Sequence, residues 1–211
     1  MTDAFSAPHP AWLLSDFAGV LGLHQSGKSR QQMASTAGAD FDDFWDSYWA
    51  ERPAYDAGEV SRDEYWKRIA AQIGTNWPSS LVATLDTLDV ESWLRPDQET
   101  LRVAEELRSA GVRLAVLSNA PLSLAAAMHE LPWLGSFERV ICSSEIRAAK
   151  PDPRCYMTAL SILDATPNRV VFVDDREVNV TGAQALGIHS VLFTDAARLR
   201  DAARLRLDLL G

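Results

Sequence analysis

The sequence predicts an α/β protein in which a parallel sheet is interrupted by a helical insertion. After Pro96, short apolar runs alternate with stretches of helical periodicity, which is the pattern of parallel strands joined by helices. An earlier apolar run at residues 11–15 has the same character. Between the two, residues 30–95 are helical in pattern, hold five of the seven tryptophans and contain no convincing strand. We therefore expect the first strand and the later strands to form one sheet.

Length and charge limit the classes of partner. A chain of 211 residues predicts one domain, or one core domain with a smaller insertion. The formal net charge of −9, without a basic patch, argues against nucleic acid or an anionic membrane as the main partner. We expect a monomer or a homodimer whose partner is a small molecule.

The N-terminal residues and the cysteines carry no targeting or metal signal. Residues 1–10 form a loose leader without the basic and apolar regions of a signal peptide, and no apolar run approaches membrane-spanning length. Cys142 and Cys155 are too few for a disulfide framework and lack metal-ligand spacing, so we expect reduced, semi-buried thiols. The sequence predicts a soluble, cytoplasmic protein.

The individual elements follow from local signals. The apolar run 11–15 suits a buried strand. In the insertion, Ser61 and Glu64 form a capping box that starts a helix ending near Gly74. Gly111 closes the helix that begins near residue 100. The remaining strands are predicted at 112–118, 139–143, 169–173 and 189–193, and the remaining helices at 121–131, 153–163 and 180–187.

Polar residues with a coherent chemistry follow the predicted strands. In an open parallel sheet, ligands bind beyond the carboxyl ends of the strands. Carboxylates gathered there favour a divalent cation such as Mg²⁺, which binds through one or two of them plus phosphate oxygens. An ammonium and a hydroxyl can hold the remaining phosphate charge, and an aspartate can act as a nucleophile by forming an aspartyl-phosphate. The residues concerned are Asp16, Ser118, Asn119, Lys150, Asp174 and Asp175.

Four short motifs carry a resemblance to a known family. DFAGVL, LSNA, AAKPDP and VFVDDREVN resemble, in order and spacing, the four motifs of the haloacid dehalogenase (HAD) superfamily. The resemblance spans residues 11–195. It implies a Rossmann-like parallel sheet core at residues 11–28 and 96–211, with a small α-helical cap at residues 29–95 inserted after the first motif.

The resemblance implies a Mg²⁺-dependent hydrolase of the phosphatase type that acts on a small phosphorylated metabolite. Asp16 would be the nucleophile and a Mg²⁺ ligand, and Ala18 would offer its backbone carbonyl to the metal. Asp174 and Asp175 would complete the metal site. Phosphate would be bound by Ser118, Asn119 and Lys150, of which Lys150 is also a catalytic candidate.

Ala18 is the main departure from the family pattern. HAD phosphatases carry at this position the aspartate that protonates the leaving oxygen and later activates water, an effect typically worth about 10²–10⁴-fold. Activity is therefore expected to be weak or specialised. Asn179 is a milder departure, because many members carry another acid there and an amide lowers the negative charge around the metal.

Three accounts of Ala18 remain open. In the first, the protein still hydrolyses phosphorylated compounds, with low-pKa leaving groups or with His24 as a substitute proton carrier. In the second, it resembles phosphonoacetaldehyde hydrolases, which have alanine here and break a C–P bond through a Schiff base on a cap lysine, for which Lys67 is available. In the third, a catalytically degenerate site binds phosphate and Mg²⁺ for regulation. A dehalogenase is disfavoured, because those members dispense with Mg²⁺ and the pair of adjacent aspartates indicates that this chain keeps it.

A second phosphate signature overlaps the first motif. Gly22, Gly27, Lys28 and Ser29 match the G-x-x-x-x-G-K-S pattern of a P-loop. A P-loop needs a strand that ends at its first glycine, which would bury Asp16 in mid-strand at a high cost. We expect a polar turn into the first cap helix instead. Whether Arg52 contacts the substrate is left open. The cap core is expected to hold Trp45, Tyr48, Trp49 and Trp66, with the alternative that one or two of them form the floor of the active site.

Overall fold

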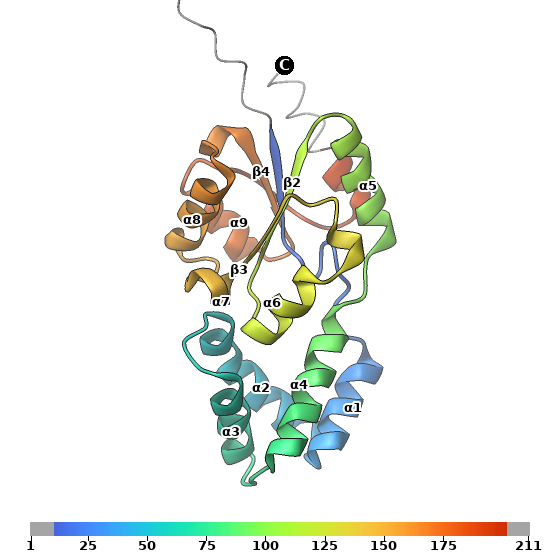
Figure 1. Ribbon diagram of the computed structural model, residues 1–211, viewed down its shortest axis with the longest axis vertical. Helices are drawn as coiled ribbons and strands as arrows, with labels where there is room; N and C mark the ends of the chain where they lie inside the picture. The colour runs from blue at the N-terminus through green and yellow to red at the C-terminus, as the bar shows by residue number, and fades with distance from the viewer. Residues whose placement is uncertain (1–10, 202–211) are drawn as a thin grey trace, which may run out of the picture.

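The computed structural model describes residues 11–201, and the predicted leader at residues 1–10 lies outside them. A five-stranded parallel sheet forms the centre of the molecule, in the order β3-β2-β1-β4-β5. Helices flank this sheet, so the architecture is the α/β, Rossmann-like fold that the alternating pattern predicts (Figure 1). The strands are β1 (Trp12–Ser15), β2 (Arg113–Ser118), β3 (Arg139–Cys142), β4 (Val170–Asp174) and β5 (His189–Leu192).

The first strand lies in the middle of the sheet. Leu14 of β1 is in register with Ala115 of β2 on one side and with Phe172 of β4 on the other. Because the strand order reverses between β1 and β4, their carboxyl ends flank the crevice where open α/β sheets bind ligands. The backbone N–H of Asp16 donates to the Val173 carbonyl at 2.8 Å, which ties the end of β1 to β4. The fold therefore brings the first and last predicted motifs together.

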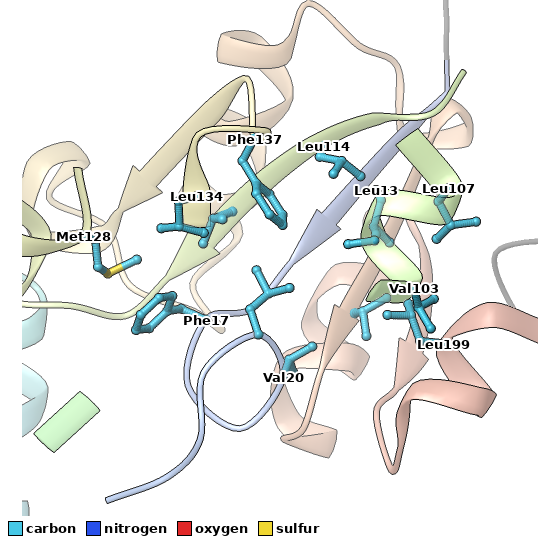
Figure 2. Close-up of a cluster of buried hydrophobic side chains, with 14 of the residues drawn as sticks. Leu13, Phe17, Val20, Val103, Leu107, Leu114, Met128, Leu134, Phe137 and Leu199 are labelled. Carbon is cyan, nitrogen blue, oxygen red and sulfur yellow. The ribbon is translucent and has the colours of Figure 1, made fainter. Parts of the chain in front are cut away.

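Both faces of the sheet are buried, as a parallel sheet requires. Leu13 belongs to a core cluster with α5 (Gln98–Ser109) and α6 (Leu122–His129), part of which Figure 2 shows. Leu14, the next residue, faces the opposite cluster with α8 (Pro153–Leu163) and α9 (Glu177–Gln184). This two-sided burial explains why the strands appear in the sequence as continuous apolar runs.

The helical insertion forms a third, separate core. Its helices are α1 (Gly27–Ala37), α2 (Phe41–Asp56), α3 (Arg62–Gln72) and α4 (Ser79–Trp93). Ser61 accepts a hydrogen bond from the Glu64 N–H at 3.2 Å, so the start of α3 lies where the capping box predicts. Aromatic side chains fill the centre of the group, and Trp45, Tyr48 and Trp66 are all buried there. Figure 1 shows the four helices beyond the carboxyl end of the sheet.

The predicted elements are found, with shifted ends and a few additions. The strand predicted to end at Ser143 stops one residue earlier, because Ser143 begins a short helix, α7 (Ser143–Ile146). The helix predicted from residue 180 begins at Glu177. Two 3₁₀ turns, η1 (Pro132–Leu134) and η2 (Pro167–Arg169), each start at a proline and have no periodicity that sequence could reveal. No helix in the stretch from residue 11 to residue 201 combines the length and the apolar character that a membrane crossing needs.

Candidate active site

Three carboxylates converge at the carboxyl ends of β1 and β4. Asp16 follows β1, Asp174 ends β4 and Asp175 comes next, and one ligand oxygen from each lies within 4.8 Å of the others. Asp174 is fully buried and Asp16 nearly so, whereas Asp175 is half-buried. The adjacency follows from the parallel pairing of β1 with β4, which brings their last residues to one edge.

Lys150 lies between two of these carboxylates. Its Nζ is 2.8 Å from Asp16 Oδ1 and 2.7 Å from Asp174 Oδ2, and it also donates to the Leu117 carbonyl at 2.7 Å. Burial alone would lower the pKa of Lys150, but the Asp16 and Asp174 carboxylates raise it above its ordinary value. The lysine is therefore held as a buried cation.

One lysine does not balance the acidic cluster. Burial raises the pKa of Asp16 to about 8, with Lys150 opposing the rise and Asp174 adding to it. Burial, followed by the charge of Asp174, also raises the pKa of Asp175. Burial is the main cause of both raised pKa values, and a divalent cation bound beside these carboxylates would favour their ionised forms.

The donor set fits such a cation. Among the described residues, the Ala18 carbonyl takes no part in a hydrogen bond, and Ala18 lines the same cavity as Asp16 and Asp175. Asn179 Oδ1 is buried without a hydrogen-bond partner in the described part of the chain and also lines this cavity. A cation bound in this cavity would give both oxygens a partner.

Asp174 is already saturated with hydrogen bonds. Its Oδ1 accepts from the Arg176 N–H at 2.9 Å, and Asn179 Nδ2 reaches both of its oxygens at 2.9 and 3.0 Å. Its Oδ2 also accepts from Lys150. These contacts favour a supporting role, in which Asp174 holds Lys150 and Asn179, and its role as a metal ligand stays a prediction.

The predicted phosphate residues come together but differ in availability. Ser118 is buried at the end of β2 and lines the cavity beside Lys150. The side chain of Asn119 is engaged elsewhere: its Oδ1 accepts from the Lys150 N–H and its Nδ2 donates to the Lys150 carbonyl, both at 2.8 Å. Asn119 thereby fixes the backbone of the lysine, and its contact with phosphate stays a prediction.

The turn after Asp16 requires glycine. Gly19 has φ +82°, and a Cβ there would lie 2.4 Å from Asp175 Oδ2 and 2.7 Å from His24 Cε1. His24 Nε2 in turn lies 3.1 Å from Asp175 Oδ2, although 66 % of the histidine side chain is exposed. The absence of a side chain at residue 19 thus allows Asp175 and His24 to close over the turn.

A cavity of about 350 Å³ lies over the acidic cluster, between the sheet and the helical insertion. The sheet side contributes the residues already described. The insertion contributes four side chains that the sequence did not single out together as site residues: Trp49, Arg52, Asp56 and Trp93. Trp49 is 48 % exposed and lines this cavity, while its ring also packs edge to face on Tyr48 of the aromatic core, with centroids 4.9 Å apart. The spacing of Arg52 and Asp56, one helical turn apart, was the signal that could have flagged the pair.

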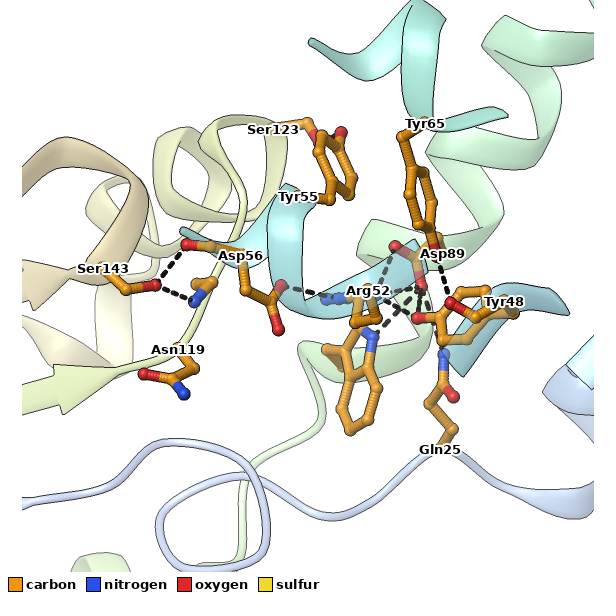
Figure 3. Close-up of polar contacts among 12 residues, drawn as sticks. Gln25, Tyr48, Arg52, Tyr55, Asp56, Tyr65, Asp89, Asn119, Ser123 and Ser143 are labelled. Atoms are coloured by element: carbon orange, nitrogen blue, oxygen red, sulfur yellow. Dashed lines mark hydrogen bonds and ion pairs between the residues drawn. The ribbon is translucent and has the colours of Figure 1, made fainter. Parts of the chain in front are cut away.

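Arg52 is the centre of a buried polar network (Figure 3). Its Nε lies 2.6 Å from Asp56 Oδ1 and its Nη1 lies 3.0 Å from Asp89 Oδ2, and Nη1 also contacts the Tyr48 hydroxyl. Asp89 accepts further hydrogen bonds from Tyr48 and from Trp93 Nε1, at 2.6 and 3.1 Å. The network fixes the inner ends of α2 and α4 over the cavity.

The structure does not support the P-loop or a Schiff base on a cap lysine. β1 ends at Ser15, Gly22 lies in a loop that bridges to Pro96, and Lys28 is exposed in the first turn of α1. Lys67 is exposed on α3 and does not line the cavity. All three lysines of the chain fall within residues 11–201, and Lys150 alone among them lines it.

Comparisons with known proteins agree with this architecture. A family model described as haloacid dehalogenase-like hydrolase matches residues 17–187. The ribulose-1,5-bisphosphate 5-phosphatase of Halopiger xanaduensis is 30 % identical over an alignment that covers 85 % of this chain and 83 % of that protein. The sesquiterpene phosphatase astK of Aspergillus oryzae is 27 % identical, over 67 % of this chain and 71 % of that one.

A solved structure shows the same fold. The HAD family enzyme bt-2542 of Bacteroides thetaiotaomicron, in complex with magnesium and inorganic phosphate, superposes with a TM-score of 0.73. The superposition covers 90 % of this chain and 98 % of that one at 19 % identity. At this identity the likeness establishes the fold alone.

Proposed function

This chain belongs to the haloacid dehalogenase-like hydrolases, and on that basis we propose that it is a Mg²⁺-dependent phosphatase that cleaves a small phosphorylated metabolite through Asp16. The observation that carries the proposal is the convergence of Asp16, Asp175 and Lys150 on one cavity at the switch point of the sheet. The names of two relatives, both phosphatases, support the reaction class.

Asp16 is the nucleophile in this proposal. Its Oδ1 accepts hydrogen bonds from the Phe17 N–H at 2.7 Å and pairs with Lys150 at 2.8 Å, which fixes the orientation of the carboxylate. Among the described residues, no donor reaches its Oδ2, so one oxygen stays available to attack phosphorus. Attack forms the Asp16–phosphate bond and breaks the bond to the leaving oxygen, and water then hydrolyses the aspartyl-phosphate.

Asp16, Asp175 and the Ala18 carbonyl would hold Mg²⁺, with Asp174 as a further predicted ligand. When bound, the metal neutralises phosphate charge and keeps the carboxylates ionised. Lys150 adds a fixed positive charge beside Asp16. Phosphate is held by Lys150, by the Ser118 hydroxyl and by the backbone of Asn119.

The helical group α1–α4 serves as the cap, with residues 29–95 as its proposed bounds, and it selects the substrate. The core residues described so far handle the phosphate and the metal, so the alcohol part of the substrate meets α2 and α4. Trp49 and Trp93 offer apolar surface there, and Arg52 adds charge. The relatives act, by name, on a sugar bisphosphate and on a sesquiterpene compound, which is consistent with substrate choice residing in this variable part.

One alternative keeps a specific observation in its favour. Ala18 cannot donate a proton, so a degenerate site that binds phosphate and Mg²⁺ without turnover is the second candidate. The position of Lys67 outside the cavity leaves phosphonoacetaldehyde hydrolysis without such support.

The test is hydrolysis of alkyl, aryl and acyl phosphates with and without Mg²⁺. Wild type is expected to release phosphate only with the metal, and Asp16→Asn is expected to abolish turnover. Asp46→Asn, at an exposed aspartate of α2, is the matched control and should leave rates unchanged. Full activity in Asp16→Asn would refute the nucleophile, whereas phosphate binding without turnover in wild type would favour the regulatory alternative.

A further inference from the structure

The site lacks an evident proton carrier for the leaving group. The methyl group of Ala18 holds no proton, and an alkoxide leaves slowly unless one is supplied. Within the described part of the chain, the titratable side chains that line the cavity, other than Asp16, Lys150 and Asp175, are His24, Arg52, Asp56 and Arg176. Arginine does not release its proton in proteins, so the choice lies between His24 and Asp56.

His24 is directed away from this task. Its Nε2 is paired with Asp175 at 3.1 Å, and two thirds of its side chain faces solvent. Asp56 is enclosed, because only 15 % of its side chain is accessible and the residue lines the cavity. Asp56 therefore lines the same cavity as Asp16 from an enclosed position.

Contacts between the cap and the core fix the position of Asp56. It is the last residue of α2, and its backbone carbonyl accepts a hydrogen bond from the Ser143 hydroxyl. The same hydroxyl accepts from the Ala120 N–H at 3.0 Å, in the loop that follows Ser118 at the end of β2 and begins at Asn119. Just after α2, Gly58 approaches the core so closely that a Cβ would lie 2.8 Å from the Ser144 carbonyl. The end of α2 is thus anchored directly over the predicted phosphate-binding loop.

The charges around Asp56 suit a group that exchanges protons near neutral pH. Among the described side chains, only Arg52 donates a hydrogen bond to the Asp56 carboxylate. Arg52 also donates to Asp89, and Asp89 accepts further hydrogen bonds from Tyr48 and Trp93. Burial raises the pKa of Asp56 to about 6, while Arg52 and, more weakly, Arg176 oppose the rise and Asp89 adds to it. An acid–base catalyst works best with a pKa close to the working pH.

We propose that Asp56, supplied by the cap, is the proton donor and acceptor that replaces the aspartate missing at residue 18. This inference rests on the proposed phosphatase function. In the first step, Asp16 bonds to phosphorus, the ester P–O bond breaks, and the proton of Asp56 passes to the leaving oxygen to give the alcohol. In the second, the Asp56 carboxylate takes a proton from water, whose oxygen attacks phosphorus and releases Asp16 and inorganic phosphate. Asp56 ends as it began, protonated.

The leaving group distinguishes this role from a structural one. A p-nitrophenolate leaves without a proton, whereas an alkoxide needs one. Asp56→Asn is therefore expected to lower the single-turnover rate of alcohol release from alkyl phosphates about 10²–10⁴-fold, and the single-turnover rate of p-nitrophenol release less than about threefold. The second step is the same for both substrates, so it loses its base equally in both and is kept out of this measurement. Glu51→Gln, at a carboxylate of α2 that pairs with Arg68 and Gln72 outside the cavity, should change neither rate.

Two further variants secure the result. Asp56→Ala removes the carboxyl, and added formate should restore alkyl ester hydrolysis. His24→Asn should leave the ratio of alkyl to aryl rates unchanged. Equal losses of the first-step rate on both substrates in Asp56→Asn, no loss on either, or no rescue by formate would overturn the assignment while the phosphatase function stands. A wild type that hydrolyses neither substrate would overturn the proposed function itself, and the inference with it.

Discussion

Replacing Gly19 by alanine tests the turn that shapes the proposed metal site. The new Cβ would lie 2.4 Å from Asp175 Oδ2, which is about 1 Å closer than ordinary contact. The backbone at φ +82° adds strain of about 1–2 kcal/mol for a residue with a side chain. The carboxylate of Asp175 must therefore move by about 1 Å or the turn must open.

A movement of this size in the Asp175 carboxylate is large compared with the variation in metal–oxygen distance that Mg²⁺ accepts. Mg²⁺ demands near-ideal octahedral geometry with oxygens at about 2.0–2.1 Å, so we expect at least a hundredfold loss of affinity. At a Mg²⁺ concentration a hundred times the wild-type Kd, binding stabilises the fold by about 2.7 kcal/mol, and a hundredfold weaker site retains about 0.4 kcal/mol. For a chain of this size the Mg²⁺-induced rise in Tm should fall from roughly 5–10 °C to about 1–2 °C.

The assay is thermal unfolding with and without Mg²⁺. Gly38→Ala is the matched control, because Gly38 also has a positive φ, +67°, but an added Cβ meets no atom within 4 Å. Both variants should lose stability without the metal, and only Gly19→Ala should lose the response to Mg²⁺. A normal Mg²⁺ response in Gly19→Ala would refute the assignment of Asp175 to the metal site.

The remaining predictions concern the buried charges and the core. Lys150→Met removes the ion-pair partner of two buried carboxylates, Asp16 and Asp174, and should lower the free energy of unfolding in urea at pH 7 by about 3–5 kcal/mol. An unchanged urea midpoint of unfolding would contradict the ion pairing. Leu13→Ala, at a side chain 1 % exposed, should cost about 2–5 kcal/mol, whereas Leu122→Ala, 61 % exposed, should cost little by the same measurement. The folded-state pKa of Asp56, about 6, lies above its ordinary value of 3.8, so the folded protein binds the proton more tightly and loses stability as pH rises between these values. Urea unfolding of wild type and Asp56→Asn at pH 4 and pH 7 measures the effect. The free energy of unfolding of wild type, relative to that of the variant, should fall by up to about 3 kcal/mol between pH 4 and pH 7. A constant difference between the two proteins would show that this pKa is not raised.

The sequence predicted the parts of the site that follow from strand order. Asp16 and Asp175 each come directly after an apolar run, and parallel pairing brings such residues to one edge. The engagement of the Asn119 side chain with the Lys150 backbone was not predictable, because it depends on how two loops meet. Asp56 was missed for the same reason: its position depends on the docking of α2 against Ser143, 87 residues later, and no local pattern records that contact.

The boundaries of elements were harder to predict than their existence. Val170 to Asp174 is apolar up to its last residue, so the strand itself was evident. The end of β3 was not, because Ser143 is equally acceptable as a strand residue or as the first residue of a helix. Its hydroxyl joins Asp56 to Ala120, and this tertiary contact accompanies the switch to α7.

The tryptophans of the insertion give the protein an intrinsic optical probe. Trp49 and Trp93 stand edge to face with ring centroids 6.3 Å apart at the cavity, while Trp45 and Trp66 are buried in the aromatic core behind them. A molecule that enters the cavity removes water from the exposed ring of Trp49 and leaves the buried rings unchanged. Tryptophan emission should therefore shift in wavelength on binding, so that affinities and binding rates can be measured in the unlabelled protein, including for compounds that it does not turn over.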